Sequence, residues 1–333
     1  MSMTQDIEAS LKALAPALLE GGEAIEGLKR LSGGASQETW AFAVTGDGHS
    51  RPLILRRAPG GGGGEARNSN AIGLPTEARL IEAAVAAGLP APGIAHVCKP
   101  ADGLGDAFIM DRVEGETIAR KILRDEEYGA ARPKLAADCG RALAGIHGID
   151  TKTLPELPES FGTDQIDRYE EIYRSFDAPR PIFELAIQWL RANAPRPLAP
   201  VLVHGDFRLG NLMIDSGGLA AVLDWELAHI GDPREDIAWA CINSWRFGVA
   251  DKRVGGFGDL PDLLAAYAAS GGPEIDEAEI DWWEILGSLK WGIMCMIMYE
   301  AFRSGADPSV ERATIGRRVS ETEIDLVNLL EKV

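Results

Sequence analysis

The sequence predicts an α+β protein of two lobes, a β-rich N-terminal lobe followed by a larger helical lobe. Its 333 residues suit two domains of ordinary size. Short strand patterns separated by glycine turns dominate up to about residue 111, and helical periodicity dominates afterwards. We therefore expect a boundary near residues 110–115, which divides the chain into residues 1–112 and 113–333.

The predicted N-terminal lobe begins with a helix and is otherwise built around strands. Residues 5–20 place apolar and charged positions at helical spacing and end at Gly21-Gly22, a natural helix stop. Glycine turns join the next three strands, which indicates an antiparallel sheet. A second helix is predicted over residues 76–87. The predicted strands are residues 25–31, 38–44, 52–56, 96–99 and 107–111.

After residue 115 the strand patterns nearly disappear, and helical periodicity dominates several segments of the chain. The exception is a short β-rich island, residues 201–226, with the sequence VLVHGDFRLGNLMIDSGGLAAVLDWE. Apolar strands at 201–203, 212–214 and 220–223 alternate there with polar loops. The predicted helices are residues 118–123, 132–147 and 182–193 and most of 259–332.

Charge and composition exclude several classes of partner. There are 51 acidic and 33 basic side chains, and the formal net charge of −18 repels nucleic-acid phosphates and anionic lipids. The N-terminus lacks the pattern of a secretory signal, and the apolar run at 291–299 is shorter than the roughly 20 residues of a spanning helix. The four cysteines have no zinc-binding spacing. We expect a cytoplasmic protein with a small-molecule partner, no nucleic acid and no membrane; the oligomeric state stays open.

Three polar side chains of the island follow or precede its short strands. Asp206 lies in the loop after the first strand, Asn211 ends that loop, and Asp224 follows the third strand. Side chains at the ends of adjacent strands can converge on one point. Phosphoryl transfer needs such a set, because a carboxylate must orient the attacking hydroxyl while amide and carboxylate oxygens hold the divalent cations.

The island resembles the catalytic region of the aminoglycoside phosphotransferase family, which has the protein-kinase-like fold. His204-Gly205-Asp206-x-x-x-x-Asn211 is similar to the family's catalytic loop, Asp224 to its metal-binding aspartate, and residues 231–239 to the segment that follows. Residues 31–36 and 53–57 resemble the kinase-like domains of acyl-CoA dehydrogenase fusion proteins. The resemblance implies a bilobal fold with an antiparallel N-lobe sheet and a mostly helical C-lobe.

The resemblance also implies a role for each matching residue. Asp206 is expected to be the catalytic base, and Asn211 and Asp224 the Mg²⁺ ligands, in transfer of the γ-phosphoryl group of ATP (or GTP) to a hydroxyl group. The expected nucleotide-binding residues are Gly33, Gly34, Ala35 and Ser36 in a loop over the phosphates, Arg56 and Glu77 as a cation and its acidic partner, and Met110, Asp111 and Val113 at an adenine-binding hinge.

One position departs from the family pattern. The third strand usually supplies a lysine to the phosphates, whereas here it ends in Arg56-Arg57, and Arg56 fits by register. Arginine can bind phosphate through two parallel hydrogen bonds, but its planar head does not simply replace an ammonium group. The sequence therefore leaves two interpretations, an active kinase with an arginine or a nucleotide-binding pseudokinase that regulates a partner. A metal-dependent phosphoesterase is a weaker third.

Other polar residues have simpler interpretations. His204 is expected to hold the catalytic loop, and Asp232 and Asp236 are expected to make capping and internal hydrogen bonds. Most tryptophans of the helical lobe are expected in its core, with one or two lining an acceptor pocket beside Asn243, Arg246 or Lys290. The acceptor is open between an aminoglycoside, a hydroxyacyl compound, choline and a sugar. A CoA ester would need a basic patch, for which Arg246, Lys290 and Arg303 are candidates.

Overall fold

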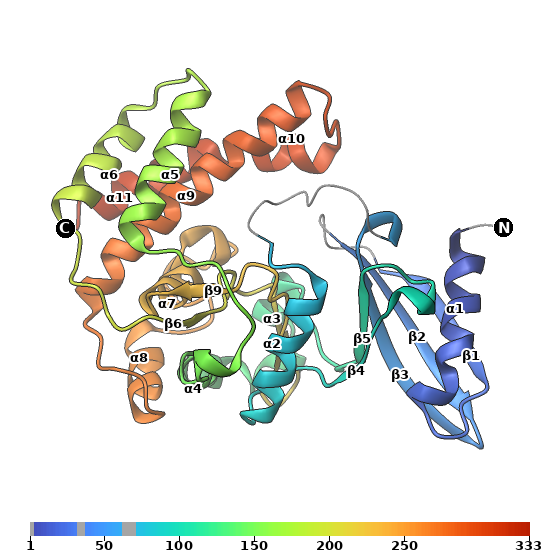
Figure 1. Ribbon diagram of the computed structural model, residues 1–333. Helices are drawn as coiled ribbons and strands as arrows, with labels where there is room; N and C mark the ends of the chain where they lie inside the picture. Colours follow the sequence, from blue (N-terminus) through green and yellow to red (C-terminus); the bar gives the residue numbers. More distant parts are fainter. Residues whose placement is uncertain (1–2, 32–36, 62–70) are drawn as a thin grey trace.

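A computed structural model describes residues 3–31, 37–61 and 71–333 and has the two predicted lobes (Figure 1). The N-lobe contains a five-stranded antiparallel sheet of order β1-β2-β3-β5-β4. All five predicted strands are present. Their bounds are β1 (Ala24–Arg30), β2 (Glu38–Gly46), β3 (His49–Arg57), β4 (Ile94–Val97) and β5 (Ala107–Asp111).

Strand β3 begins three residues earlier than predicted because the turn before it is tight. Gly46 pairs with His49, so the loop consists only of Asp47 and Gly48. Both have positive φ, 50° and 77°, as in the two-residue turns that match the twist of a hairpin. Both strands can therefore run to the turn, and the ladder ends only at Arg57.

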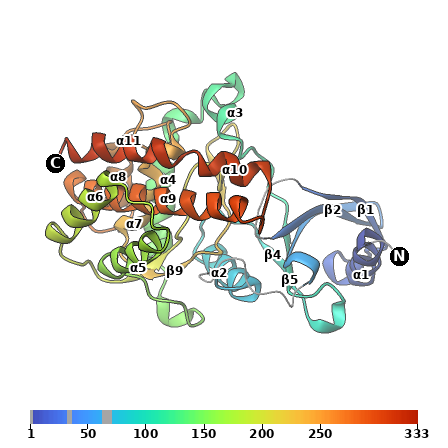
Figure 2. The same ribbon diagram turned by 90° about the horizontal axis from the view of Figure 1, so that it is seen from above.

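The two faces of the sheet are covered by different helices. Helix α1 (Met3–Leu18) packs on one face and α2 (Leu74–Ala86) lies on the other (Figures 1 and 2). Side chains alternate along β3, so Leu53 and Leu55 join the α1 core while Ile54 joins the α2 core. Arg56, two residues after Ile54, is therefore on the α2 face, which faces the C-lobe. This confirms the predicted register.

The C-lobe consists of helices around two small β-ribbons. The ribbons are β6 (Val201–Val203) with β9 (His229–Gly231) and β7 (Leu212–Ile214) with β8 (Leu219–Val222). Strand β9 and helix α5 were not predicted; α5 is polar overall and buries only Gln165, Ile166 and Tyr173, so few apolar residues mark its buried face. The helices are α3 (Ala119–Arg124), α4 (Arg132–His147), α5 (Gly162–Ser175), α6 (Pro181–Ala192), α7 (Arg234–Cys241), α8 (Leu260–Ala269), α9 (Glu277–Arg303), α10 (Val310–Gly316) and α11 (Val319–Leu330).

Helix α9 is the central helix of the C-lobe. It contacts α5, α6, α7, α10 and α11, and Figure 2 shows it running beneath α11. It is long and apolar enough to cross a membrane by length and composition alone, but 56% of its apolar window is buried inside the protein. Because it also buries Glu284 and Lys290 against partners from other elements, we interpret it as a core helix.

The lobes are joined by more than the connection at residue 112. Apolar residues of α2 and of the α2-facing side of the sheet belong to the same continuous core as α4, α7 and α9. Two backbone hydrogen bonds also cross between the lobes: Ile72 N donates to Glu226 O at 3.0 Å, and Val222 N donates to Pro90 O at 2.8 Å. These hydrogen bonds fix the end of β8 and the segment after it against the residues that flank α2.

Candidate active site

The loop between β6 and β7, residues 204–211, is fixed to the start of α7. Both carboxylate oxygens of Asp236 accept backbone hydrogen bonds, from His204 N at 2.7 Å and Gly205 N at 2.9 Å. Gly205 has φ +83°, and a Cβ there would lie 2.3 Å from the carbonyl oxygen of Leu227. Glycine is therefore required at this turn, and Asp236 makes the internal hydrogen bonds expected of it.

The side chain of His204 is buried and supports the backbone of this loop. It is fully buried, its Nδ1 accepts from the backbone N–H of Asp206 at 3.2 Å, and its Nε2 lies 3.1 Å from the carbonyl oxygen of Leu223. The proton therefore belongs on Nε2, which can donate to that carbonyl. Burial lowers the pKa of His204, although nearby carboxylates oppose this shift. The geometry agrees with the structural role expected for this histidine.

Asp206 is held by three side-chain donors. Its Oδ1 accepts from Trp239 Nε1 at 2.7 Å and from Arg208 Nε at 2.9 Å, and its Oδ2 accepts from Asn211 Nδ2 at 2.6 Å. Asn211 Nδ2 also donates to the backbone oxygen of Asp206 at 3.0 Å. The amide oxygen is consequently the atom that Asn211 can offer to a cation.

Asn211 and Asp224 lie at the same end of the β7–β8 ribbon. Leu212 pairs with Val222, and Leu223 N donates to Asn211 O at 2.8 Å, which brings the following Asp224 beside Asn211. Asp224 has φ +66°, an uncommon left-handed conformation for a residue other than glycine. The structure thus places Asp224 next to Asn211 along the ribbon, and the side chain of Asn211 binds Asp206, so the three predicted residues lie in one region.

Residues from both lobes meet at Arg56. Its Nη2 lies 2.8 Å from Asp224 Oδ1 and 3.4 Å from Glu77 Oε1, so the predicted pair with the α2 glutamate is present. Its Nε donates to Gln37 Oε1 at 2.9 Å, and Gln37 Nε2 donates to Glu226 Oε2 at 3.1 Å. Sequence reasoning missed Gln37 because a single polar residue before a strand carries no signal.

The Arg56 cluster, defined as Arg56, Glu77, Asp224, Glu226 and Gln37, contains more negative than positive charge. Burial raises the pKa of Glu77 to about 7 despite the opposing charge of Arg56. Burial would also raise the pKa of Asp224, but the charge and hydrogen bond of Arg56 outweigh it and leave that pKa below its ordinary value. One cation among three carboxylates leaves room for further positive charge.

The predicted nucleotide-binding residues have different outcomes. Gly33, Gly34, Ala35 and Ser36 lie outside the described residues. Met110 is buried on β5, and the amide of Asp111 donates to Gly93 O at 2.8 Å while its carboxylate binds Arg51. That amide is therefore engaged within the protein, and the adenine-binding role of Met110, Asp111 and the half-buried Val113 stays a prediction.

Aromatic side chains line up beyond Asp206, on the C-lobe side of the loop. Trp239 and Trp245 have ring centroids 5.7 Å apart, Trp245 and Trp291 4.8 Å apart. The guanidinium of Arg208 lies 4.5 Å from the centroid of Trp245. The cation of Arg208 and the aromatic rings thus lie beside the carboxylate of Asp206. The contact between Asp206 and Trp239 was not predicted from the sequence.

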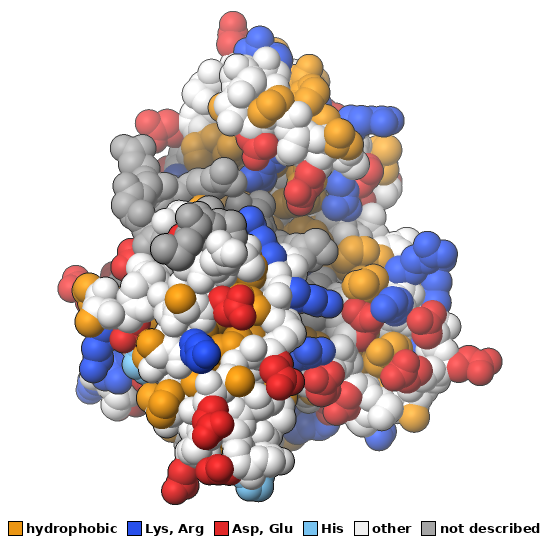
Figure 3. Space-filling model, turned by 90° about the vertical axis from the view of Figure 1, so that its right-hand side faces the viewer, with side chains coloured by type: hydrophobic (Ala, Val, Ile, Leu, Met, Phe, Trp, Pro, Cys, Tyr) orange, Lys and Arg blue, Asp and Glu red, His pale blue; other side chains and the backbone are white. Residues whose placement is uncertain are grey.

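The cations proposed for a basic patch are already paired. Arg246 binds Glu284 at 2.6 Å, Lys290 binds Glu235 at 2.7 Å, and Arg303 binds Glu300 at 2.8 Å. Lys290 is buried, and Asn243 donates to Asp325 at 2.8 Å. These residues do not form the basic patch that a CoA ester would require. Acidic and basic side chains are also interspersed over the N-lobe end of the molecule in Figure 3.

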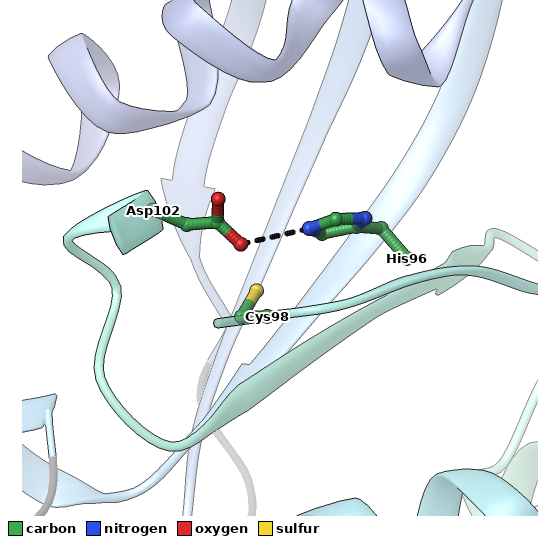
Figure 4. A group of neighbouring side chains, drawn as sticks. All are labelled: His96, Cys98 and Asp102. Carbon is green, nitrogen blue, oxygen red and sulfur yellow. Dashed lines mark hydrogen bonds and ion pairs between the residues drawn. The ribbon is translucent and has the colours of Figure 1, made fainter. Parts of the chain in front are cut away.

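A second group of metal-binding residue types lies in the N-lobe. The nearest ligand atoms of His96, Cys98 and Asp102 are all within 4.8 Å of one another (Figure 4). Asp102 Oδ2, however, already accepts from Lys99 N at 2.7 Å and contacts His96 Nε2 at 2.8 Å, and burial raises the pKa of the Cys98 thiol to about 12. We interpret this group as the support of a turn that packs against α1, away from Asp206.

An antiparallel-sheet lobe joined to a helical lobe, with two aspartates and an asparagine on the side of the C-lobe that contacts Arg56 of the N-lobe, is the arrangement of the protein-kinase-like phosphotransferase fold. The chain belongs to the phosphotransferase enzyme family, whose profile matches residues 27–283. This family membership agrees with the resemblance that the loop at residues 204–211 showed in the sequence.

Individual relatives agree with this assignment. The chain is 31% identical over 202 residues to mouse acyl-CoA dehydrogenase family member 10, which covers 58% of this chain and 18% of that protein. The present chain thus spans less than a fifth of the length of the mouse protein. The fold is similar to that of a Ralstonia eutropha protein described as a candidate aminoglycoside phosphotransferase (TM-score 0.74, 21% identity, 97% and 98% of the two chains covered). It is also similar to an aminoglycoside phosphotransferase variant in complex with AMP-PNP and hygromycin B (TM-score 0.59, 18% identity, 96% and 98% covered).

Proposed function

We propose that the protein transfers the γ-phosphoryl group of Mg-ATP to a hydroxyl group of a small molecule, with Asp206 as the base. The observation that carries this proposal is the meeting of Asp206, Asn211 and Asp224 opposite the pair of Arg56 and Glu77. Carboxylate and amide oxygens beside a phosphate-binding cation are the set that phosphoryl transfer requires.

The donor set fits magnesium. Asp224 offers carboxylate oxygens and Asn211 offers its amide oxygen, the hard ligands that Mg²⁺ prefers. The excess of carboxylates over cations in the Arg56 cluster favours a further cation at the same place. When bound, Mg²⁺ would neutralise the phosphate oxygens; Arg56 would leave Asp224 and turn its guanidinium to the phosphates. Asp206 would orient the acceptor hydroxyl and take its proton.

For the acceptor, the residues around Asp206 favour a hydroxyacyl compound over an aminoglycoside. Arg208 lies against Asp206 and Trp245, and its permanent charge disfavours a polycation at this place. An acyl chain would instead contact the half-buried indole ring of Trp291, which packs against Trp245. The similarity to acyl-CoA dehydrogenase family member 10 supports the same choice. Arg246, Lys290 and Arg303 are paired, so we propose recognition of the acyl part rather than of a CoA phosphate.

The test is Mg-ATP consumption across a panel of hydroxy acids, hydroxyacyl thioesters, choline, sugars and aminoglycosides. We expect Asp206→Asn and Asp224→Asn each to lower turnover by about 1,000-fold or more, because the base or a cation ligand is lost. Asp215→Asn is the matched control, since Asp215 only accepts backbone hydrogen bonds in an exposed turn. Unchanged turnover in either site variant would contradict the mechanism.

The presence of Arg56 in place of lysine favours one alternative, a nucleotide-binding pseudokinase. ATP binding without hydrolysis or transfer to any member of the panel would support it. Transfer that depends on Asp206 would exclude it.

A further inference from the structure

We infer that Trp239 is a positioning residue for Asp206. Its indole N–H occupies an acceptor position of Oδ1, which leaves Oδ2 as the oxygen that takes the proton of the acceptor hydroxyl. This inference rests on the proposed function, in which Asp206 is the base. The alternative is that Trp239 only fills the core of the C-lobe.

The hydrogen bonds of the carboxylate distinguish its two oxygens. Oδ1 accepts from Trp239 Nε1 at 2.7 Å and from Arg208 Nε at 2.9 Å, whereas Oδ2 accepts from Asn211 Nδ2 at 2.6 Å. Each oxygen of an ionised carboxylate has about two acceptor positions. Oδ1 is therefore filled, and Oδ2 keeps one position for an incoming hydroxyl group.

The indole of Trp239 has little freedom to leave this position. It is 6% exposed, it contacts Trp245, and Lys290 Nζ lies 5.7 Å from its ring centroid. Lys290 is in turn held by Glu235 at 2.7 Å and by Gln165 at 2.5 Å.

The backbone of α9 approaches the same ring. A Cβ at Gly287 would lie 3.4 Å from Trp239 Cε3 and 2.6 Å from Ile242 Cδ1, so glycine allows α9 to lie close to α7 at this level. Packing on both sides thus fixes the direction of the indole N–H, and that N–H is a donor only. A donor held in this way orients the carboxylate before the acceptor arrives.

Trp283 provides a matched comparison. It is a buried tryptophan on α9 and lines the same small cavity as Trp239, about 10 Å³ in volume. Its Nε1 has no hydrogen-bond partner among the described residues, whereas Trp239 Nε1 binds Asp206. Replacement of either tryptophan by phenylalanine keeps an aromatic ring, but only one replacement removes a hydrogen bond to the carboxylate.

The kinetic test compares Trp239→Phe with Trp283→Phe, using an acceptor from the panel above. We expect kcat to fall about tenfold in Trp239→Phe, the effect of losing one hydrogen bond to a charged group. The KM for ATP should stay within twofold, because this indole contacts Asp206 and not the Arg56 cluster, and Trp283→Phe should keep the wild-type kcat. Equal kcat values in the two variants at equal melting temperature would overturn the inference.

A spectroscopic test does not depend on turnover. In protein with ¹⁵N-labelled tryptophan, the indole resonance of Trp239 is the one missing from Trp239→Phe. We expect this resonance to move upfield in Asp206→Ala, with the Trp283 resonance unchanged; an unmoved Trp239 resonance would overturn the inference. Absence of transfer by the wild-type enzyme would instead remove the proposed function, and with it the role assigned to this contact.

Discussion

The contact region between the lobes and the interior of the C-lobe each hold a cluster of charged side chains, and the two differ in their balance of positive and negative charge. In the Arg56 cluster one arginine faces the carboxylates of Glu77 and Asp224, with Glu226 joined through Gln37. In the interior, the single carboxylate of Glu235 faces Lys290 at 2.7 Å and His229 at 3.2 Å and also accepts from Gln165. We call this second group the Glu235 cluster.

The ionisation of the two glutamates reflects this difference. Burial raises the pKa of Glu77 to about 7, because the charge of Arg56, which Asp224 shares, does not compensate the loss of hydration. Burial acts on Glu235 in the same direction, but Lys290 and His229 outweigh it and hold its pKa well below the usual range. A buried cluster with sufficient partners stabilises the fold, whereas one with a deficit of positive charge is suited to recruit a cation.

The largest effect on stability is expected from Lys290→Met. This change leaves Glu235 buried without its main partner, and breaking a buried ion pair costs about 3–5 kcal/mol of unfolding free energy. Urea denaturation measures it. Lys252→Met is the control, because the exposed pair of Lys252 with Asp259 is worth about 1 kcal/mol or less. Similar losses of unfolding free energy in Lys290→Met and Lys252→Met would contradict the conclusion that the Glu235 cluster stabilises the fold.

A smaller effect, and one on activity, is expected from Arg56→Met. We predict that kcat/KM for ATP falls about 100-fold, or about 2.7 kcal/mol, since the guanidinium no longer reaches the phosphates. Arg57→Met is the neighbouring control: Arg57 lies on the opposite face of β3, 3.5 Å from Glu38. If Arg57→Met lowers kcat/KM for ATP as much as Arg56→Met does, the register-based assignment fails.

The smallest effect concerns pH and Glu77. With a folded-state pKa of about 7 against an ordinary value of 4.5, the folded protein keeps a proton that the unfolded chain releases between these values. Stability should therefore fall as the pH rises from about 4.5 to 7, by an amount of the order of 2 kcal/mol from this group.

Glu77→Gln cannot titrate and should flatten this part of the profile. Unfolding free energies measured from pH 4.5 to 8 compare the two proteins. The control is Glu82→Gln, a half-buried residue of the same helix that pairs with Arg79 at the surface. An unchanged slope in Glu77→Gln would show that Glu77 is ionised throughout and that Arg56 compensates its burial more fully than described.

Much of the fold could be predicted from local patterns. The N-lobe strands are mainly apolar runs next to glycine turns, at Gly46 and Gly48 between β2 and β3 and at Gly103 and Gly105 before β5, so these three strands followed from the sequence. The loop proposed to be catalytic was found because Gly205, Asp206 and Asn211 have the spacing of a known motif and stand between two apolar strands. Helix α5 was missed because charged side chains dominate it and its buried residues include Gln165.

The missed parts of the site depend on distant packing. Gln37 reaches Glu226 across 189 positions of the chain, and Trp239 reaches Asp206 through the angle at which α7 meets the loop. Neither contact leaves a spacing or composition signal. Arg56 was found only because the alternation along β3 decides which of two neighbouring arginines turns toward α2.

The apolar core shared by α2, one face of the sheet and the C-lobe helices constrains how the protein can be divided. A fragment that ends at residue 112 would leave Ile54, Phe108 and the buried face of α2 in contact with water, and an isolated C-lobe would have a matching apolar hollow. During synthesis, the emerging N-terminal half therefore needs the later helices before it can complete its interior. The protein is better suited to reassembly from two co-expressed pieces than to the purification of either piece alone.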